Sequence, residues 1–180
     1  ERYRELFSHL VFDAVAVTCG TCREALAALE IGGVFGCAVA DASRLALDLG
    51  APVGLAGDFL YHAPCHDSLD GGGAALLEKA GARVGVVPHC CSEAGTLALS
   101  RPDITGAMLH RKRAALAEAR AGQPGPSVLL TNCPSCLTGL GRNHDLGIEQ
   151  RHIAVELARA LSGPAWLEKL RERARIAQPV

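Results

Sequence analysis

Short apolar runs alternate with longer helical patterns along most of the chain. Four runs have the length and apolar character of buried strands, at 13–18, 59–62, 83–87 and 127–131. Between and after them, the pattern predicts helices over 22–30, 38–49, 73–80, 102–121, 134–141 and 150–162. This alternation indicates an α/β fold with largely parallel sheets.

Two of the predicted helices carry a recognisable apolar face. The helix that begins at Pro102 has a face formed by Ile104, Met108 and Ala115. The helix over 150–162 has a stripe formed by Ile153, Leu157 and Leu161. The basic run HRKR at 110–113 predicts a solvated face, with a docking surface for a partner domain as the alternative.

An internal repeat divides the chain. AVAVTCGTCREAL at 14–26 aligns with VLLTNCPSCLTGL at 128–140, and each copy reads as a strand, a C-x-x-C motif and a helix. We therefore expect duplicated Rossmann-like modules. Residues 1–57 would be the carboxyl-terminal half of a first repeat, 58–162 a complete second repeat, and 163–180 a final helix and tail.

Composition narrows the class of protein. The 180 residues suffice for a sizeable core, and a net charge of −1 does not favour a nucleic-acid or membrane-surface binder. The longest apolar run, at 31–40, is too short to cross a bilayer, and the charged opening ERYRELF is not a signal peptide. We expect a cytoplasmic domain that belongs to a longer chain, because no methionine begins it.

Eight cysteines are many for such a domain. In a reducing compartment, metal binding or redox chemistry is favoured over a disulfide scaffold. The adjacent Cys90 and Cys91 also argue against a disulfide, because consecutive α-carbons lie about 3.8 Å apart, closer than a relaxed bridge allows.

Five cysteines of the second repeat are predicted to meet. Each follows a predicted strand, and the carboxyl ends of parallel strands gather at one edge of a sheet; the five are Cys65, Cys90, Cys91, Cys133 and Cys136. Cys133 and Cys136 also begin a predicted helix, where the helix dipole and free N–H groups stabilise thiolates. Thiolates are the ligands of soft metals and of iron–sulfur clusters.

The spacing favours an iron–sulfur cluster, with zinc and thiol redox chemistry left open. A zinc site commonly uses two closely spaced C-x-x-C knuckles, which do not occur here. His62, His66 and His89 flank the predicted ligands, either as hydrogen-bond donors to sulfur or as turn caps, and His66 could replace a cysteine. Cys37, in an apolar run, is predicted to be a small core residue.

APCH, HCC-x-x-x-G and NCPSC, in this order, resemble the CCG-type cysteine-rich domain. That domain occurs in heterodisulfide reductase, in the iron–sulfur subunit of glycolate oxidase and behind FAD-linked oxidase domains. The resemblance implies a [4Fe-4S] cluster, cubane or non-cubane, on Cys65, Cys90, Cys91, Cys133 and Cys136. Ser92 stands where the family has glycine, whereas Gly95 keeps the later glycine. Cys19 and Cys22 match the C-x-x-C of a first copy and would be ligands in the intact protein.

The resemblance implies an electron-transfer domain of a larger flavin-linked oxidoreductase that oxidises a 2-hydroxy acid such as lactate or glycolate. FAD would sit on a partner domain or subunit, and any contact with the inner face of the membrane would be made through partners. We do not expect the isolated chain to turn over substrate. The alternatives are a zinc-stabilised interaction module and a thiol–disulfide oxidoreductase that uses Cys133 and Cys136.

Overall fold

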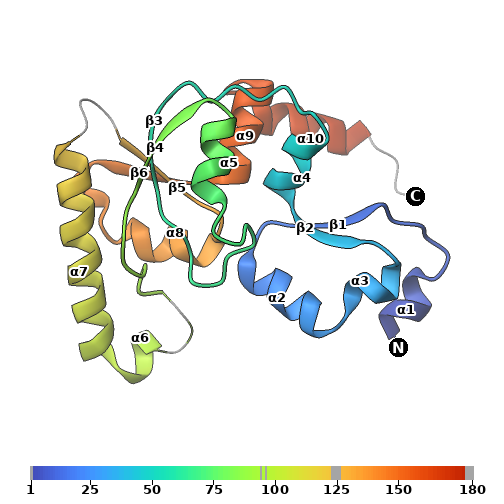
Figure 1. Ribbon diagram of the computed structural model, residues 1–180, viewed down its shortest axis with the longest axis horizontal. Coiled ribbons are helices and arrows are strands. Elements are labelled where there is room, and N and C mark those ends of the chain that lie inside the picture. The colour runs from blue at the N-terminus through green and yellow to red at the C-terminus, as the bar shows by residue number, and fades with distance from the viewer. Residues whose placement is uncertain (1, 94, 96, 123–126, 177–180) are drawn as a thin grey trace.

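The computed structural model describes residues 2–93, 95, 97–122 and 127–176 (Figure 1). Strands and helices alternate along the chain, in the order α1 (Arg2–Phe7), β1 (Ala14–Val17), α2 (Gly20–Ala28), α3 (Ile31–Phe35), β2 (Ala38–Asp41), α4 (Ala42–Asp48), β3 (Gly57–Tyr61), α5 (Gly73–Lys79), β4 (Ala82–Val86), α6 (Leu97–Ser100), α7 (Pro102–Ala121), β5 (Ser127–Thr131), α8 (Pro134–Gly141), the 3₁₀ helix η1 (His144–Leu146), β6 (Ile148–His152), α9 (Ile153–Ser162) and α10 (Trp166–Ile176). The fold is therefore mixed α/β, as the sequence predicts.

The described strands form two parallel sheets. β1 pairs with β2, and the other four strands lie in the order β4-β3-β5-β6. The two inner strands, β3 and β5, are the most apolar, and Phe59–Tyr61 and Leu129–Thr131 are buried in them. The edge strands are more polar, because each has one neighbour and a solvated side.

Side chains alternate between the two faces of the larger sheet, so two helical layers cover it. Phe59, Tyr61 and Leu130 face the layer that contains α5 and α9. Leu60 and Leu129 face the opposite layer, which contains α7 and α8. Cys91, Cys133 and Cys136 belong to this second core, and the cysteine chemistry therefore develops on the α7–α8 side.

Two predicted helices begin later than expected, because a short strand precedes each. The segment 38–49 opens with β2, and the Asp41 side chain caps α4 by accepting from the backbone N–H of Ser43 at 2.8 Å. The segment 150–162 opens inside β6, and His152 caps α9 by accepting from the Ala154 N–H at 3.1 Å. Strands this short contain too few residues for the alternation of apolar and polar positions to be recognised when a helix follows directly.

The apolar faces of α7 and α9 differ in part from the prediction. In α7 the buried residues are Thr105, Lys112 and Leu116, whereas Ile104 is exposed. In α9 Ile153 and Leu157 are buried as expected, whereas Leu161, in the last turn, is exposed. The HRKR run is accordingly not a uniformly solvated face, because Lys112 has an exposed fraction of 0 %.

The two C-x-x-C segments have matching local structure. Each follows a strand, β1 or β5, and each first cysteine occupies the N-cap position of its helix with extended backbone, at φ −149° for Cys19 and φ −132° for Cys133. A parallel strand then follows in each half, and its last residue caps the next helix. These correspondences are what a duplication would produce, while the domain boundaries at 57 and 162 stay a prediction.

Polar contacts join the smaller sheet to the larger one. The Ser68 hydroxyl donates to the Asp41 carboxylate at 2.5 Å, and His152 Nε2 donates to the Thr18 carbonyl at 2.9 Å. Gly20 packs so tightly against the His66 backbone that a side chain there would collide with it. The end of β1 is thereby held beside the loop that follows β3. Within the described residues, no helix combines the length and apolar character that a bilayer crossing requires.

Candidate metal centre

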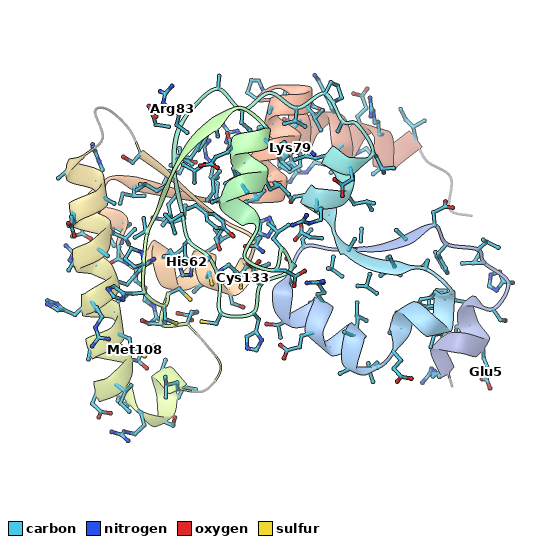
Figure 2. All side chains as sticks on the ribbon, viewed as in Figure 1. Glu5, His62, Lys79, Arg83, Met108 and Cys133 are labelled. Atoms are coloured by element: carbon cyan, nitrogen blue, oxygen red, sulfur yellow. The ribbon has the colours of Figure 1, made fainter. Side chains whose placement is uncertain are left out.

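The cysteine-bearing loops leave three neighbouring strands at their carboxyl ends. Cys65 follows β3, Cys90 and Cys91 follow β4, and Cys133 and Cys136 follow β5. Because the strand order is β4-β3-β5, these loops begin side by side at one edge of the sheet. Figure 2 shows sulfur atoms near the labelled His62 and Cys133. All eight cysteines of the chain are free thiols.

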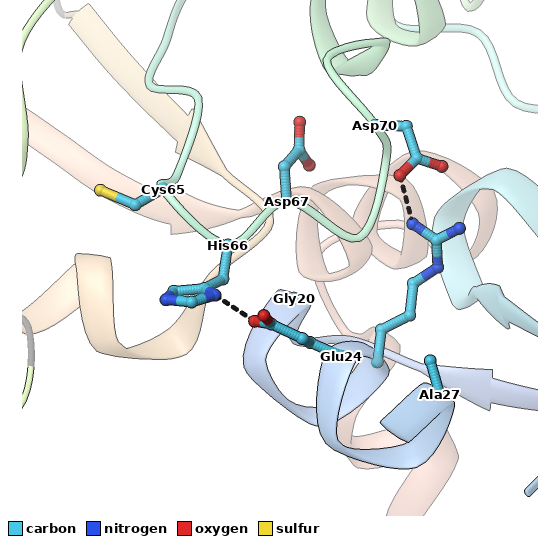
Figure 3. A pocket seen from close by; sticks show the side chains of 8 residues that line it. Gly20, Glu24, Ala27, Cys65, His66, Asp67 and Asp70 are labelled. Atoms are coloured by element: carbon cyan, nitrogen blue, oxygen red, sulfur yellow. Dashed lines mark hydrogen bonds and ion pairs between the residues drawn. The ribbon is translucent and has the colours of Figure 1, made fainter. Parts of the chain in front are cut away.

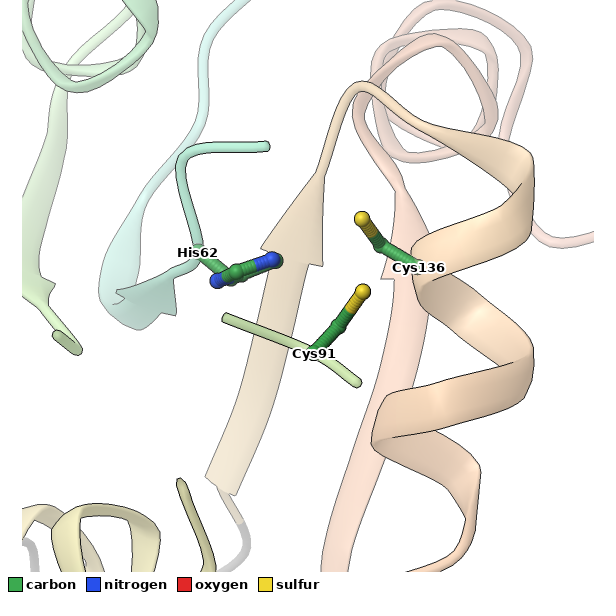
Figure 4. A group of neighbouring side chains, drawn as sticks. All are labelled: His62, Cys91 and Cys136. Atoms are coloured by element: carbon green, nitrogen blue, oxygen red, sulfur yellow. The ribbon is translucent and has the colours of Figure 1, made fainter. Parts of the chain in front are cut away.

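Two close groups of sulfur atoms form at this edge. The Cys65 and Cys90 Sγ atoms lie 3.7 Å apart, and both belong to exposed or half-buried residues. A ring nitrogen of His62 and the sulfurs of Cys91 and Cys136 all lie within 4.8 Å of one another, and these three residues are buried (Figure 4). The centre therefore has an open side and a buried side.

The adjacent cysteines connect the two groups. Cys90 points to Cys65, and Cys91 points to Cys136 and His62. The turn around them has left-handed backbone on both sides, with φ +72° at His89 and φ +67° at Ser92. Since residues other than glycine rarely adopt this conformation, the backbone at Ser92 accounts for the glycine that the resemblance leads one to expect at this position.

Cys133 is held as a thiolate by the start of α8. Donation from the Cys136 thiol and from the backbone N–H groups of Cys136 and Ser135 lowers the pKa of Cys133 to about 6. Pro134 occupies the first turn of the helix, where its missing N–H costs nothing. The sequence NCPSC thus builds a thiolate site from local geometry.

Cys91 is the most acidic thiol of the group. Its pKa falls to about 4, because the Cys136 thiol donates to it and because His62 and the Glu93 N–H add to the stabilisation. The pKa of Cys136 is raised correspondingly, since its proton serves both Cys133 and Cys91. The buried group therefore holds negative charge at neutral pH.

Cys19 and Cys22 lie beside this centre. They begin α2, and Cys22 is exposed. A hydrogen bond with Cys19 is the main cause that raises the pKa of Cys22, and the Cys133 thiolate adds to it. Neighbouring Thr21 lines a cavity of about 280 Å³ together with Cys65, Cys133 and Cys136. The fold brings both C-x-x-C motifs to one place, while the ligand role of every cysteine stays a prediction. Cys37, predicted to be a core residue, is only half-buried, and it precedes β2 instead of following a strand.

A second hollow, of about 350 Å³, opens on the exposed side of Cys65 (Figure 3). Its polar side chains are already paired, Arg23 with Asp70 at 2.5 Å and His66 with Glu24. These contacts join α2 to the loop after β3. His66 is thus turned toward α2, whereas His62 faces the sulfur atoms of Cys91 and Cys136, and His89 is exposed.

Lys112 is the residue of the centre that sequence reasoning missed. Its amino group is buried and donates to the Val87 and Pro88 carbonyls at 3.0 and 2.9 Å, and it lies 3.1 Å from His62 Nδ1. Burial lowers its pKa to about 8, and the electrostatic effect of Cys91, Cys136 and Cys90 opposes this lowering. The spacing of Lys112 from Leu116 is a helical signal for the buried face, but the surrounding basic run obscured it.

The donor set fits a soft metal or an iron–sulfur cluster. Several thiolates converge, and the buried Nε2 atom of His62 has no hydrogen-bond partner among the described residues. A buried ammonium group close to the thiols also balances an anionic centre. These features together define a cysteine-rich α/β domain with a thiolate centre at a sheet edge.

Comparison with known families agrees with this definition. Residues 59–141, from β3 to the end of α8, match the family of the cysteine-rich domain named CCG. The recognition made from the three motifs is confirmed for this segment, which holds Cys65, Cys90, Cys91, Cys133 and Cys136. Such a domain is consistent with an iron–sulfur or other metal site.

Two further comparisons add little. No curated protein matches the chain. Among solved structures, glutamate racemase isoform RacE1 from Bacillus anthracis is similar, with 15% sequence identity and a TM-score of 0.43 over 97% of this chain. The match spans 64% of the racemase chain. A likeness at this level transfers neither the detailed fold nor the activity.

Proposed function

We propose that the chain binds an iron–sulfur cluster through Cys65, Cys90, Cys91, Cys133 and Cys136. The observation that supports it best is the convergence of these thiols at one sheet edge, where the Cys65 and Cys90 sulfurs lie 3.7 Å apart and the Cys91 and Cys136 sulfurs lie within 4.8 Å of each other. The lowered pKa values of Cys91 and Cys133, about 4 and about 6, add to this support. Metal ligands must be deprotonated, and thiolates are the ligands that iron–sulfur clusters use. Adjacent Cys90 and Cys91, whose side chains diverge, suit two different iron atoms of a bulky cluster.

Such a cluster would supply one-electron transfer. The role of the protein would then be to hold the thiolates, to bury Cys91, Cys133 and Cys136, and to leave Cys65 exposed toward a partner. We propose that the domain works within a larger flavin-linked oxidoreductase that oxidises a 2-hydroxy acid, with FAD on another domain or subunit. The cluster is proposed to be of the [4Fe-4S] type, with cubane and non-cubane forms left for experiment.

The test is anaerobic purification followed by reconstitution with iron and sulfide. Iron, acid-labile sulfide and zinc are measured per chain, and electron paramagnetic resonance reports the cluster type. Serine variants of Cys65, Cys91 and Cys133 should lose iron and sulfide, whereas Cys37→Ser should retain both. Zinc bound without sulfide would overturn the proposal. Anaerobic mixing with photoreduced FAD tests the flavin link, and a reconstituted cluster that stays oxidised would count against it.

Zinc is the second candidate, and one observation favours it. His62, Cys91 and Cys136 form a buried group with ligand atoms within 4.8 Å of one another, which is close to a three-ligand zinc site. Thiol redox chemistry draws its support from the thiolate of Cys133 in a C-x-x-C motif at a helix start. Two measurements distinguish the zinc site from the thiol redox site. Bound zinc supports the first, and a Cys133–Cys136 disulfide, detected by mass spectrometry of the oxidised protein, supports the second.

A further inference from the structure

Lys112 reaches the cysteine centre from the outer helix α7. Its Nζ atom has three neighbours at hydrogen-bond distance, which are the carbonyl oxygens of Val87 and Pro88 and the Nδ1 atom of His62. Val87 and Pro88 lead directly into the turn that carries the adjacent cysteines. The lysine is therefore fixed by the backbone of that turn and by the histidine that faces the sulfur atoms.

His62 is held as firmly as Lys112. It directly follows β3, and its backbone N–H donates to the Leu130 carbonyl of β5 at 2.9 Å. Its side chain has an exposed fraction of 1 %. With Nδ1 against Lys112, Nε2 is the ring nitrogen left to face Cys91 and Cys136, whose sulfur atoms lie within 4.8 Å of a ring nitrogen of His62 (Figure 4). Among the described residues, Nε2 has no closer hydrogen-bond partner. The imidazole therefore bridges the ammonium group and the thiolates.

The hydrogen positions follow from the chemistry of the partners. The two carbonyl oxygens can only accept, so they take two hydrogens from Nζ. If the third contact is made by an ammonium hydrogen, His62 Nδ1 accepts, and the ring proton of the neutral imidazole is on Nε2. If Lys112 were a neutral amine, Nδ1 would donate to it and Nε2 would be free to bind a metal.

The surroundings favour the ammonium form. Its three hydrogens have three acceptors, so no donor is left unpaired in the core. The negative charge of the nearby Cys91 thiolate also stabilises a positive charge on Lys112. Under these conditions the Nε2–H group is a donor that needs an acceptor, and sulfur is what it faces.

We propose that Lys112 and His62 form a positioning pair for the cysteine centre: Lys112 holds His62 in the Nε2–H tautomer, and His62 acts as a hydrogen-bond donor to the sulfur of Cys91 and not as a metal ligand. Lys112 also supplies a buried positive charge beside the thiolates. Where the centre carries the proposed iron–sulfur cluster, both groups stabilise its more negative, reduced state and raise its reduction potential. This last step rests on the proposed function, whereas the tautomer does not.

The tautomer is tested on the metal-free, reduced full chain. The ¹⁵N chemical shifts of labelled histidine at neutral pH distinguish protonated from unprotonated ring nitrogens, and His62→Gln assigns the signals. We expect His62 to carry its proton on Nε2, and Lys112→Met to shift the signals toward the Nδ1–H form. Thr105→Val, another buried change in α7, should leave them in place. An Nδ1–H tautomer in the unsubstituted protein would overturn the proposal, even if Lys112→Met fails to fold.

The donor role is tested on the reconstituted protein. His62→Leu should retain iron and sulfide but shift the reduction potential to a more negative value, and His62→Gln, whose amide can donate, should restore part of the shift. Loss of iron in both variants would mean that His62 is a ligand and would overturn the proposal. If no cluster forms in the unsubstituted protein, the proposed function fails, and the tautomer measurement still decides the role of Lys112.

Discussion

Gly139 of α8 lies so close to Cys91 that a β-carbon at residue 139 would stand 2.4 Å from the Cys91 carbonyl oxygen. The helix that carries Cys136 therefore packs directly on the turn that carries Cys91. This contact sets how closely the two thiols approach each other, because neither backbone has room to move inward. A glycine in the middle of a helix, otherwise unfavourable, has here a packing reason.

Gly139→Ala should push the Cys91 turn away from α8. We expect a loss of roughly 1–3 kcal/mol in the free energy of unfolding, measured by urea denaturation, because the added methyl group meets backbone atoms. Bound iron after reconstitution should fall as well. Gly141→Ala is the matched control in the same helix, since its nearest neighbour would be the Gln150 side chain at 3.9 Å. Equal stability of the two variants would contradict the prediction.

Ser92→Gly should stabilise the protein. Ser92 has φ +67°, and its buried hydroxyl has no partner among the described residues. Glycine relieves the left-handed backbone strain and removes the unpaired hydroxyl. These two gains exceed the cost of the added conformational entropy of the unfolded chain, so we expect the free energy of unfolding to increase by up to about 1 kcal/mol. Thermal and urea unfolding measure it. Ser92→Ala removes only the hydroxyl, so a gain as large as that of glycine would show that backbone strain is not the cause.

Gly20→Ala should disrupt the contact between α2 and the loop that holds Cys65. The new β-carbon would lie 1.8 Å from the His66 carbonyl oxygen, so the two segments must separate. We expect a loss of roughly 1–3 kcal/mol in the free energy of unfolding by urea and faster alkylation of the half-buried Cys19, measured by mass spectrometry. Gly33→Ala, where a β-carbon meets nothing within 4 Å, should instead be neutral or stabilising. Unchanged alkylation in Gly20→Ala would argue against the contact.

The stability of the metal-free, reduced protein should increase with pH between about 6 and 9. In this range the unfolded chain keeps protons on Cys91 and Cys133, whereas the folded protein has lost them, because the pKa values fall from 9.0 to about 4 and about 6. Stability is lost as the pH falls through these lowered values. The raised pKa of Cys136 acts in the opposite direction only above pH 9, where the unfolded chain loses its proton.

Urea unfolding at a series of pH values measures this slope. Cys91→Ser should flatten it, since a serine hydroxyl does not ionise in the range. Cys37→Ser changes a thiol at the amino-terminal end of β2, outside the cysteine centre. It is the control and should leave the slope unchanged. A free energy of unfolding that decreases from pH 6 to pH 9 in the unsubstituted protein would contradict the lowered pKa values.

The sequence predicted the inner strands well and two outer ones poorly. β3 and β5 are buried on both faces, and their apolar runs therefore stand out. β2 and β6 merge into the helices that follow them without a glycine or proline to separate the two. For such short segments, pairing with a neighbouring strand decides the structure, and that pairing cannot be seen in the local sequence.

The placement of the cysteine motifs followed from the strand order, but the role of Lys112 did not. Motifs that follow parallel strands are brought to one edge by topology, so Cys65 and Cys133 were expected near each other. The burial of a lysine depends on acceptors from distant segments, here the carbonyls of Val87 and Pro88 and the ring of His62. A basic run in the sequence gives no sign of such partners.

The pairing of β3 with β5 has a consequence for how the chain folds. Leu60 pairs with Leu129, so two strands far apart in sequence must meet before Cys65 and Cys133 can share an edge. Contacts of such long range form late and slowly compared with local helices. During synthesis Cys65, Cys90 and Cys91 emerge before β5 exists, and they spend that interval as separate thiols. Surrounding reductants, and not the fold, must protect them from oxidation until β5 is in place.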